Sequence, residues 1–230
     1  MADDVRSMEP VIHIIDDDRS FRTALGRLVE TYGFRARSYE SGEDFLARAP
    51  ESEAGCILLD LRMPGLSGPQ LQERIAQAAP LLPIVFLTGQ GTVAAGVQAM
   101  KDGADDFLEK PVMSETLREV IDRALAHNER RRADRDRLQP LQAKVSGLTP
   151  RETQVFDLVV RGKRNKQVAY DLNTSERTIK AHRHSIMEKL GATSLAEMVS
   201  IAERLGLVRP TPTMSGRTPG PSPKANIHER

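Results

Sequence analysis

Short apolar runs alternate with segments of helical periodicity over the first half of the chain. Between the runs, apolar residues recur three or four positions apart, as at Phe21, Leu25 and Val29, and this spacing predicts amphipathic helices. The runs are nearly continuous and bounded by turn residues, which is typical of strands buried on both faces. The predicted strands are Val11–Asp16, Phe34–Tyr39, Gly55–Asp60, Pro83–Thr88 and Asp106–Leu108. Strands alternating with helices predict an α/β fold, a five-stranded parallel sheet covered on both faces.

A long, increasingly polar helix is predicted after the last strand. It begins near Ser114 and continues to Leu138, through the charged stretch HNERRRADRDR. Pro140 is expected to end or interrupt it, because proline lacks the amide donor and clashes with the preceding turn. We interpret residues 126–146 as a helical linker with a solvated charged face, although such a helix can also pair with its copy in a dimer.

An all-α second domain of four helices is predicted over residues 147–208. Its first helix begins with a capping box at Thr149 and Glu152, with proline at the first helical position. A later helix ends near Asp171 and the next begins at Ser175. Asn173 tolerates the left-handed conformation of a tight turn, and Ser175 can cap a helix. This pattern predicts a helix-turn-helix, whose second helix enters the major groove of DNA.

The ends of the chain and its composition complete the domain plan. Residues 1–9 form an N-terminal extension to the first domain, residues 10–125, and the Pro- and Gly-rich residues 209–230 are predicted to be disordered. No apolar stretch approaches the roughly 20 residues that span a bilayer. The single cysteine, Cys56, lies in an apolar run and suits a reducing compartment. We therefore expect a cytoplasmic protein with no membrane partner.

Chemically active side chains follow several of the predicted strands. Asp16 and Asp17 follow the first strand, and Asp60 ends the third. Because the carboxyl ends of parallel strands meet at one edge, we expect these carboxylates to lie together, where they would repel unless a cation such as Mg²⁺ bound them. Thr88 ends the fourth strand and Lys110 follows the fifth, which adds a hydroxyl and an ammonium group to the same edge.

These side chains are suited to receiving a phosphoryl group. Asp60 would attack as the nucleophile, Lys110 and Mg²⁺ would neutralise charge, Thr88 would bind an oxygen, and Gly89 leaves open space beside them. Each residue by itself is better explained by a surface salt bridge. Their common place at successive strand ends favours phosphoryl chemistry.

With these motifs, residues 10–125 resemble the receiver domain of bacterial two-component response regulators. The resemblance implies a flavodoxin-like sheet and phosphorylation of Asp60 by a sensor histidine kinase. It implies that Mg²⁺ is held by Asp17, Asp60 and the backbone carbonyl of Arg62, with Asp16 completing the acidic cluster. It also implies a cis bond between Lys110 and Pro111, and a switch in which Phe107 moves with Thr88. Phe107 could equally be an ordinary core or interface aromatic.

Positive charge concentrates in the predicted helix-turn-helix. Residues 161–190 hold eight lysines and arginines against three acids, in a chain whose net charge is only +1. Such a concentration favours binding to nucleic-acid phosphates. On the helix predicted over residues 176–190, Ile179, Ile186 and Leu190 share an apolar face. The polar side chains left to project outward are Thr178, Lys180, Arg183 and His184.

The segment that runs from LTPRE to KLGA resembles the four-helix output domain of LuxR-type regulators. A receiver followed by this domain is the architecture of the FixJ/NarL class. The resemblance implies that Lys180 and Arg183 contact base edges or the groove. It further implies phosphate contacts from Lys166, Ser175 and Arg177. His182 would either contact DNA or make a structural hydrogen bond within the domain.

Together the two resemblances imply a phosphorylation-dependent transcription regulator whose only catalysis is its own phosphoryl transfer and dephosphorylation. The expected partners are a sensor histidine kinase, promoter DNA and RNA polymerase, and phosphorylation is expected to produce a homodimer. One alternative is a phosphatase or dehalogenase with an aspartyl nucleophile, but such enzymes usually have a second acid where this chain has Arg62. Another is a regulator with a vestigial receiver that binds DNA without phosphorylation, although every residue that the chemistry needs is present.

Overall fold

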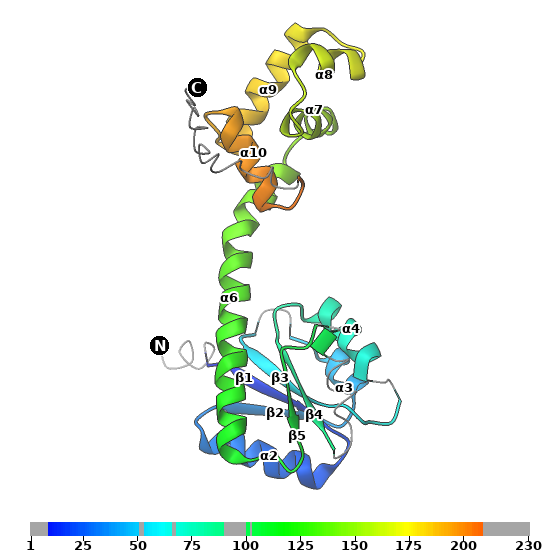
Figure 1. Ribbon diagram of the computed structural model, residues 1–230, viewed down its shortest axis with the longest axis vertical. Coiled ribbons are helices and arrows are strands. Elements are labelled where there is room, and N and C mark those ends of the chain that lie inside the picture. Colours follow the sequence, from blue (N-terminus) through cyan, green and yellow to red (C-terminus); the bar gives the residue numbers. More distant parts are fainter. Residues whose placement is uncertain (1–8, 51–52, 66–67, 90–99, 102, 209–230) are drawn as a thin grey trace, which may run out of the picture. The chain divides into compact units, whose positions relative to one another are not determined.

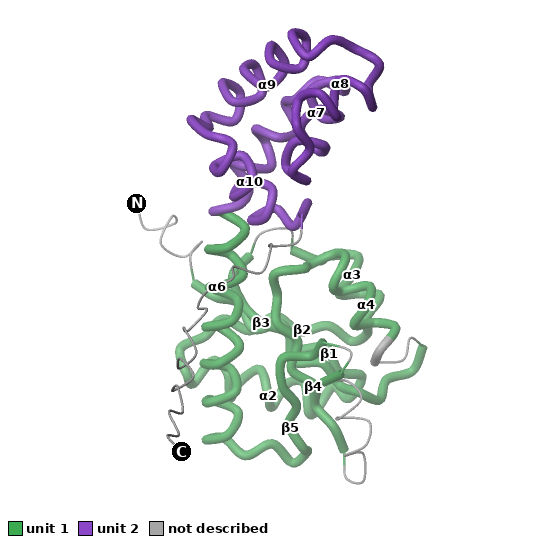
Figure 2. The backbone as a smooth tube through the Cα atoms, turned by 45° about the horizontal axis from the view of Figure 1, so that its top comes forward, with its two compact units in different colours: residues 1–136 green, residues 137–230 purple. Residues whose placement is uncertain are grey.

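The computed structural model describes residues 9–50, 53–65, 68–89, 100–101 and 103–208. The chain divides into two compact units, residues 1–136 and residues 137–230, which Figure 2 colours differently. The predicted disordered tail and all but the last residue of the predicted N-terminal extension lie outside the described residues. Within the described part of the chain, no helix is both long enough and apolar enough to cross a membrane.

The first unit contains the predicted five-stranded sheet. The strands are β1 (Val11–Ile15), β2 (Arg35–Tyr39), β3 (Gly55–Asp60), β4 (Ile84–Thr88) and β5 (Asp106–Glu109). All pairings are parallel, in the order β2-β1-β3-β4-β5. The strand order reverses between β1 and β3, and sheets of this kind bind ligands at the carboxyl ends of the strands beside that point.

Helices cover both faces of this sheet, as Figure 1 shows. The first part of α6 (Ser114–Ser146) packs with α2 (Arg19–Thr31) on one face, and α3 (Gly42–Ala47) packs with α4 (Gly68–Ala78) on the other. Successive side chains of a strand point to opposite faces. In β3, Cys56 and Leu58 therefore enter one core while Ile57 and Leu59 enter the other. Burial on both faces explains the nearly continuous apolar runs in the sequence.

A buried asparagine ties α6 to the sheet. Asn128 is 2% exposed, and its side chain accepts a hydrogen bond from the Gly55 backbone N–H at 3.1 Å. The same side chain donates to the backbone carbonyl of Leu81 at 2.7 Å. Gly55 begins β3 and Leu81 precedes β4, so both partners lie at the amino-terminal edge of the sheet, where Asn128 satisfies groups that burial would otherwise leave unpaired.

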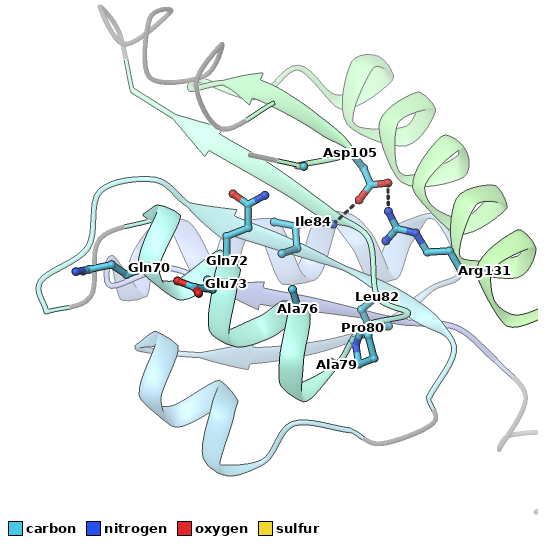
Figure 3. A pocket seen from close by; sticks show the side chains of 11 residues that line it. Gln70, Gln72, Glu73, Ala76, Ala79, Pro80, Leu82, Ile84, Asp105 and Arg131 are labelled. Carbon is cyan, nitrogen blue, oxygen red and sulfur yellow. Dashed lines mark hydrogen bonds and ion pairs between the residues drawn. The ribbon is translucent and has the colours of Figure 1, made fainter. Parts of the chain in front are cut away.

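A cavity of about 570 Å³ lies between α4 and the beginnings of β4 and β5. Figure 3 shows Asp105 on its wall, accepting hydrogen bonds from the Ile84 backbone N–H at 3.1 Å and from Arg131 of α6 at 2.9 Å. The carboxylate of Asp105 is thus already engaged in holding β4, β5 and α6 together. None of the predicted site residues lines this cavity, and they lie at the carboxyl edge of the sheet.

The expectation that Pro140 ends or interrupts the long helix is wrong. α6 runs from Ser114 to Ser146 with Pro140 inside it. Proline removes one helical hydrogen bond, but the residues that follow are held by tertiary contacts. Leu141 and Val145 pack against the core of the second unit, and Lys144 donates to the carbonyl of Leu190 at 3.0 Å. These contacts outweigh the local cost of the proline.

The second unit has the four predicted helices around one core. They are α7 (Pro150–Val160), α8 (Asn165–Asp171), α9 (Glu176–Leu190) and α10 (Leu195–Arg204). The predicted capping box at Thr149 and Glu152 is present. Asn173 has a φ of 48°, as the predicted turn requires, and Ser175 is the N-cap of α9. The helix-turn-helix prediction is therefore confirmed in its local geometry.

A histidine is buried on β1, the strand next to the edge strand β2. His13 on β1 is 0% exposed, with its Nδ1 3.1 Å from the Tyr39 hydroxyl and its ring against those of Tyr39 and Phe45. Burial lowers the pKa of His13 from 6.5 to about 4. The folded protein therefore keeps this imidazole neutral at pH values at which the unfolded chain is protonated.

We predict that His13 makes the first unit less stable in mild acid. The contribution of His13 to the free energy of unfolding is complete above pH 6.5 and falls as the pH drops toward 4. In that window the unfolded chain takes up a proton on His13 and the folded protein does not. Between pH 7 and pH 5 the loss should be about 2 kcal/mol, and it should be absent in His13→Gln. Hydrogen-exchange protection of the β1 amides at both pH values measures it, and an equal loss in the variant would refute the assignment to His13.

Candidate phosphoacceptor site and DNA-binding surface

The structure brings the sequence-predicted receiver residues to one edge of the sheet. Asp16 directly follows β1, Asp60 ends β3, Thr88 ends β4, and Lys110 directly follows β5. Because these four strands are parallel neighbours, their carboxyl ends converge. Asp16 is 0% exposed, Thr88 is 4% exposed and Asp60 is 7% exposed, so the edge is a recess rather than a solvated rim.

Lys110 bridges two of the acids. Its Nζ lies 2.7 Å from Asp16 Oδ2 and 3.0 Å from Asp60 Oδ2. Burial raises the pKa of Asp16, and the hydrogen bond from Lys110 opposes that rise. For Lys110, burial acts against the charged form, but hydrogen bonds to Asp16 and Asp60 outweigh burial, so the pKa of Lys110 is raised. A charged ammonium group is therefore held against Asp60.

The second oxygen of each bridged acid is fixed by backbone. Asp16 Oδ1 accepts from the Asp18 N–H at 2.9 Å, and Asp60 Oδ1 accepts from the Arg62 N–H at 3.1 Å. Each carboxylate is thus oriented by its own backbone N–H donor and by Lys110. Asp17 is exposed at the mouth of the same recess.

These acids fit a small divalent cation. Asp16, Asp17 and Asp60 each offer a carboxylate oxygen within 4.8 Å of the others. The donors are hard oxygens, few in number and open to solvent on the Asp17 side, which suits Mg²⁺ with retained waters. Such a cation would supply positive charge for phosphoryl oxygens. Arg62, whose backbone carbonyl the family resemblance adds to the set, lies two residues after Asp60 at this edge.

Open space and a hydroxyl lie at the end of β4, the strand that pairs with β3. A methyl group added to Gly89 would meet no heavy atom within 4 Å. Thr88 precedes it, and its carbonyl accepts from the Lys110 N–H at 2.7 Å, which ties the ends of β4 and β5 together. The Lys110–Pro111 bond is cis, as predicted. Phe107 on β5 is 36% exposed, on the strand next to Thr88.

Two contacts at this site involve residues that the sequence did not single out for it. The Phe21 ring lies beside the Lys110 ammonium, 4.2 Å from Nζ to the ring centroid. Arg22 donates to the backbone carbonyl of Asp16 at 2.5 Å. Both residues follow Asp18, the N-cap of α2. The sequence could have indicated both contacts, because the predicted helix begins shortly after the first strand. The first turn of such a helix lies close to the end of the strand that precedes it.

In the second unit, most of the predicted DNA-contact residues are exposed, on α8, at the N-cap of α9 or along α9. The exposed members are Lys166, Ser175, Arg177, Thr178, Lys180 and His184. Ser175 Oγ accepts from the Thr178 N–H at 3.1 Å and lies 2.8 Å from the Thr178 hydroxyl, so the first turn of α9 is ordered by its own cap.

Arg183 does not project freely outward, which corrects the sequence interpretation. It is half-buried on the flank of α9, and its Nη1 donates to Asn165 Oδ1 of α8 at 2.6 Å. Its position lies between the apolar face and the exposed face of the helix, so the neighbouring helix covers it. One guanidinium nitrogen is used there, and the other N–H groups retain donor capacity. His182 is also half-buried.

A buried glutamate fixes the opposite flank of α9. Glu152 of α7 accepts from the Thr149 N–H at 2.8 Å, the Ser185 hydroxyl at 2.7 Å and the Lys189 ammonium at 2.6 Å. These hydrogen bonds, led by that from Lys189, lower the pKa of Glu152 to about 2. The capping box that the sequence predicts thus also orients α9, a long-range role that local spacing does not reveal.

A doubly wound parallel sheet with an acidic recess at its switch point, followed by a helix-turn-helix unit, defines the class of response regulators with a DNA-binding output. Comparison with known proteins supports both halves. Residues 12–122 match the response regulator receiver domain, and residues 146–202 match the bacterial regulatory proteins of the luxR family.

Relatives match along most of their length. The chain is 37% identical over 201 residues to the response regulator protein TmoT of Ectopseudomonas mendocina, covering 87% of this chain and 91% of that protein. It is 39% identical over 191 residues to the transcriptional regulatory protein FixJ of Rhizobium meliloti, covering 83% of this chain and 94% of that one. The chain therefore belongs to the two-component response regulators of the FixJ/NarL class.

Solved structures of response regulators match the fold of this chain. The response regulator StyR matches with a TM-score of 0.62 and 40% identity, over 85% of this chain and 99% of that one. Full-length FixJ from B. japonicum matches with a TM-score of 0.52 and 37% identity, over 86% and 98% of the two chains. The fold assignment thus holds for both domains.

Proposed function

We propose that this response regulator is switched by phosphorylation of Asp60 and binds promoter DNA through α9. A sensor histidine kinase supplies the phosphoryl group, and the phosphorylated form dimerises in the cytoplasm, binds two half-sites and engages RNA polymerase. The observation that supports this most directly is the Lys110 bridge, which holds a cation against an oriented aspartate beside the open space at Gly89.

The transfer needs little movement of the protein. An Asp60 carboxylate oxygen forms a bond to phosphorus while the phosphorus–nitrogen bond of the kinase phosphohistidine breaks, and its electron pair returns to the imidazole. Mg²⁺ bound by Asp16, Asp17, Asp60 and the carbonyl of Arg62 would neutralise phosphoryl charge. Lys110 already donates to Asp60 Oδ2 at 3.0 Å and is placed to follow the new negative oxygens.

Thr88 and Phe107 form the proposed switch. Thr88 is buried at the end of β4, one residue before the space at Gly89, so its hydroxyl can reach a phosphoryl oxygen with a small shift. Phe107 is partly exposed on the adjacent strand and can enter the space that Thr88 leaves. The surface around β5 changes as a result, and this change favours pairing of two receivers.

The DNA contacts divide by place on the helix-turn-helix. Lys166, Ser175 and Arg177, near the beginnings of α8 and α9, are proposed to contact phosphates. The proposed groove contacts, on or beside the exposed face of α9, are Thr178, Lys180, Arg183 and His184. Arg183 takes part through the N–H groups that Asn165 leaves available.

Phosphorylation should be specific to one aspartate. Incubation of the protein with acetyl phosphate and Mg²⁺ should add about 80 Da, one phosphoryl group, measured by intact mass spectrometry. Asp60→Asn should show no gain, and Asp122→Asn, at an exposed acid of α6, should behave like the unsubstituted protein. An adduct that persists in Asp60→Asn would place the phosphoacceptor elsewhere. No adduct in any form would favour a regulator with a vestigial receiver.

Substitutions on the helix-turn-helix should separate base contacts from phosphate contacts. With a duplex enriched by this protein from a random library, Lys180→Ala should cost about 1–3 kcal/mol and relax base preference. Lys166→Ala should weaken binding to all duplexes alike and reduce the salt dependence by about one phosphate contact. Arg204→Ala, an exposed change on α10, is the control. Equal effects of all three changes would contradict the proposed surface.

A further inference from the structure

The Lys110 ammonium group has a third neighbour besides its two carboxylates. An ammonium carries three N–H donors, and Asp16 and Asp60 accept from Nζ at 2.7 and 3.0 Å. The Phe21 ring lies beside the same nitrogen, with its centroid 4.2 Å from Nζ. At this distance the negative face of an aromatic ring attracts a cation.

Local structure fixes the ring in this position. The Asp18 side chain caps α2 by accepting from the Ser20 and Phe21 N–H groups at 2.8 and 3.2 Å. The Phe21 side chain is half-buried and packs against the core shared by α2 and α6. The next residue, Arg22, donates to the Asp16 carbonyl. Two consecutive residues of the first turn thus brace the end of β1 and the lysine that reaches it.

We propose that Phe21 is a positioning residue for phosphoryl transfer, holding the Lys110 ammonium between Asp16 and Asp60 through its aromatic face. The ring attracts the cation but accepts no conventional hydrogen bond from it. It also occupies the side from which water would otherwise solvate Lys110. The charge of Lys110 is therefore directed at Asp60 and at the phosphoryl group that Asp60 accepts. This inference rests on the proposed function.

Simple packing is the competing explanation for Phe21, and ring fluorination distinguishes the two. Fluorine atoms weaken the negative face of the ring while nearly preserving its shape. We would place mono-, di- and trifluorophenylalanine at position 21 of the full chain and measure the initial rate of phosphorylation by acetyl phosphate with Mg²⁺. The rate should fall stepwise, roughly 3- to 10-fold for the trifluoro form. The urea midpoint of unfolding should stay unchanged.

Substitutions of Phe21 by natural amino acids, and fluorination of a second phenylalanine as a control, complete the test. Phe21→Tyr keeps the aromatic face and should stay close to the unsubstituted rate, whereas Phe21→Leu keeps apolar bulk and should resemble the trifluoro form. Phe34 is the control, because its ring lies 5.3 Å from the Arg118 guanidinium, on a residue outside the acidic recess. Fluorination of Phe34 should leave phosphorylation unchanged.

A second measurement needs neither Mg²⁺ nor phosphorylation. In the metal-free protein, ring current should shift the Lys110 ε-methylene NMR signals upfield, and Phe21→Leu should abolish the shift. A flat fluorination series, with normal phosphorylation of the unsubstituted protein, would overturn the positioning role alone. Failure of the unsubstituted protein to accept any phosphoryl group would overturn this role together with the proposed function.

Discussion

The bridge from Lys110 to Asp16 and Asp60 is the interaction on which the receiver site depends. It joins the residue after β5 to the ends of β1 and β3, at the point where strand order reverses. Asp16 is fully buried, and a buried charge is costly unless it is paired and hydrogen-bonded. Loss of one partner of a buried pair typically costs roughly 3–5 kcal/mol. The same bridge that stabilises the edge therefore keeps positive charge beside the proposed nucleophile.

In the second unit, polar contacts from several elements likewise fix the orientation of a helix. α9 is held on one flank by Glu152, on the other by Asn165, and at its carboxyl end by Lys144 of α6. Three polar contacts from three helices fix its orientation, so the exposed face can present side chains without reorganising. α6 contributes to both cores, through Leu117 and Ile121 in the first unit and Leu141 in the second. A single helix is thus packed into both the receiver unit and the helix-turn-helix unit.

Local rules in the sequence predict much of this structure. Strands buried on both faces require nearly continuous apolar residues, which is why GCILLD is recognisable as a strand. Asn173 in its turn and Thr149 at its helix cap are recognisable because their roles depend only on residues close to them in the chain. The Pro140 expectation fails because distant packing outweighs a local penalty. The Phe21 contact could have been expected from its place in the first turn after β1. The contacts of Arg183 and Glu152 depend on which helices meet in space, and spacing along the chain does not contain that information. Family resemblance supplied the roles of the site residues, and the geometry supplied the neighbours that orient them.

The central claim is that phosphorylation of Asp60 changes how the output unit binds DNA. The most direct measurement is the dissociation constant for a duplex enriched from a random library, determined with and without acetyl phosphate and Mg²⁺ at fixed salt. If phosphorylation pairs the receivers, affinity should rise at least about tenfold through effective concentration. Asp60→Asn should show no change. Equal affinity in the two states, with phosphorylation confirmed by mass, would contradict the account.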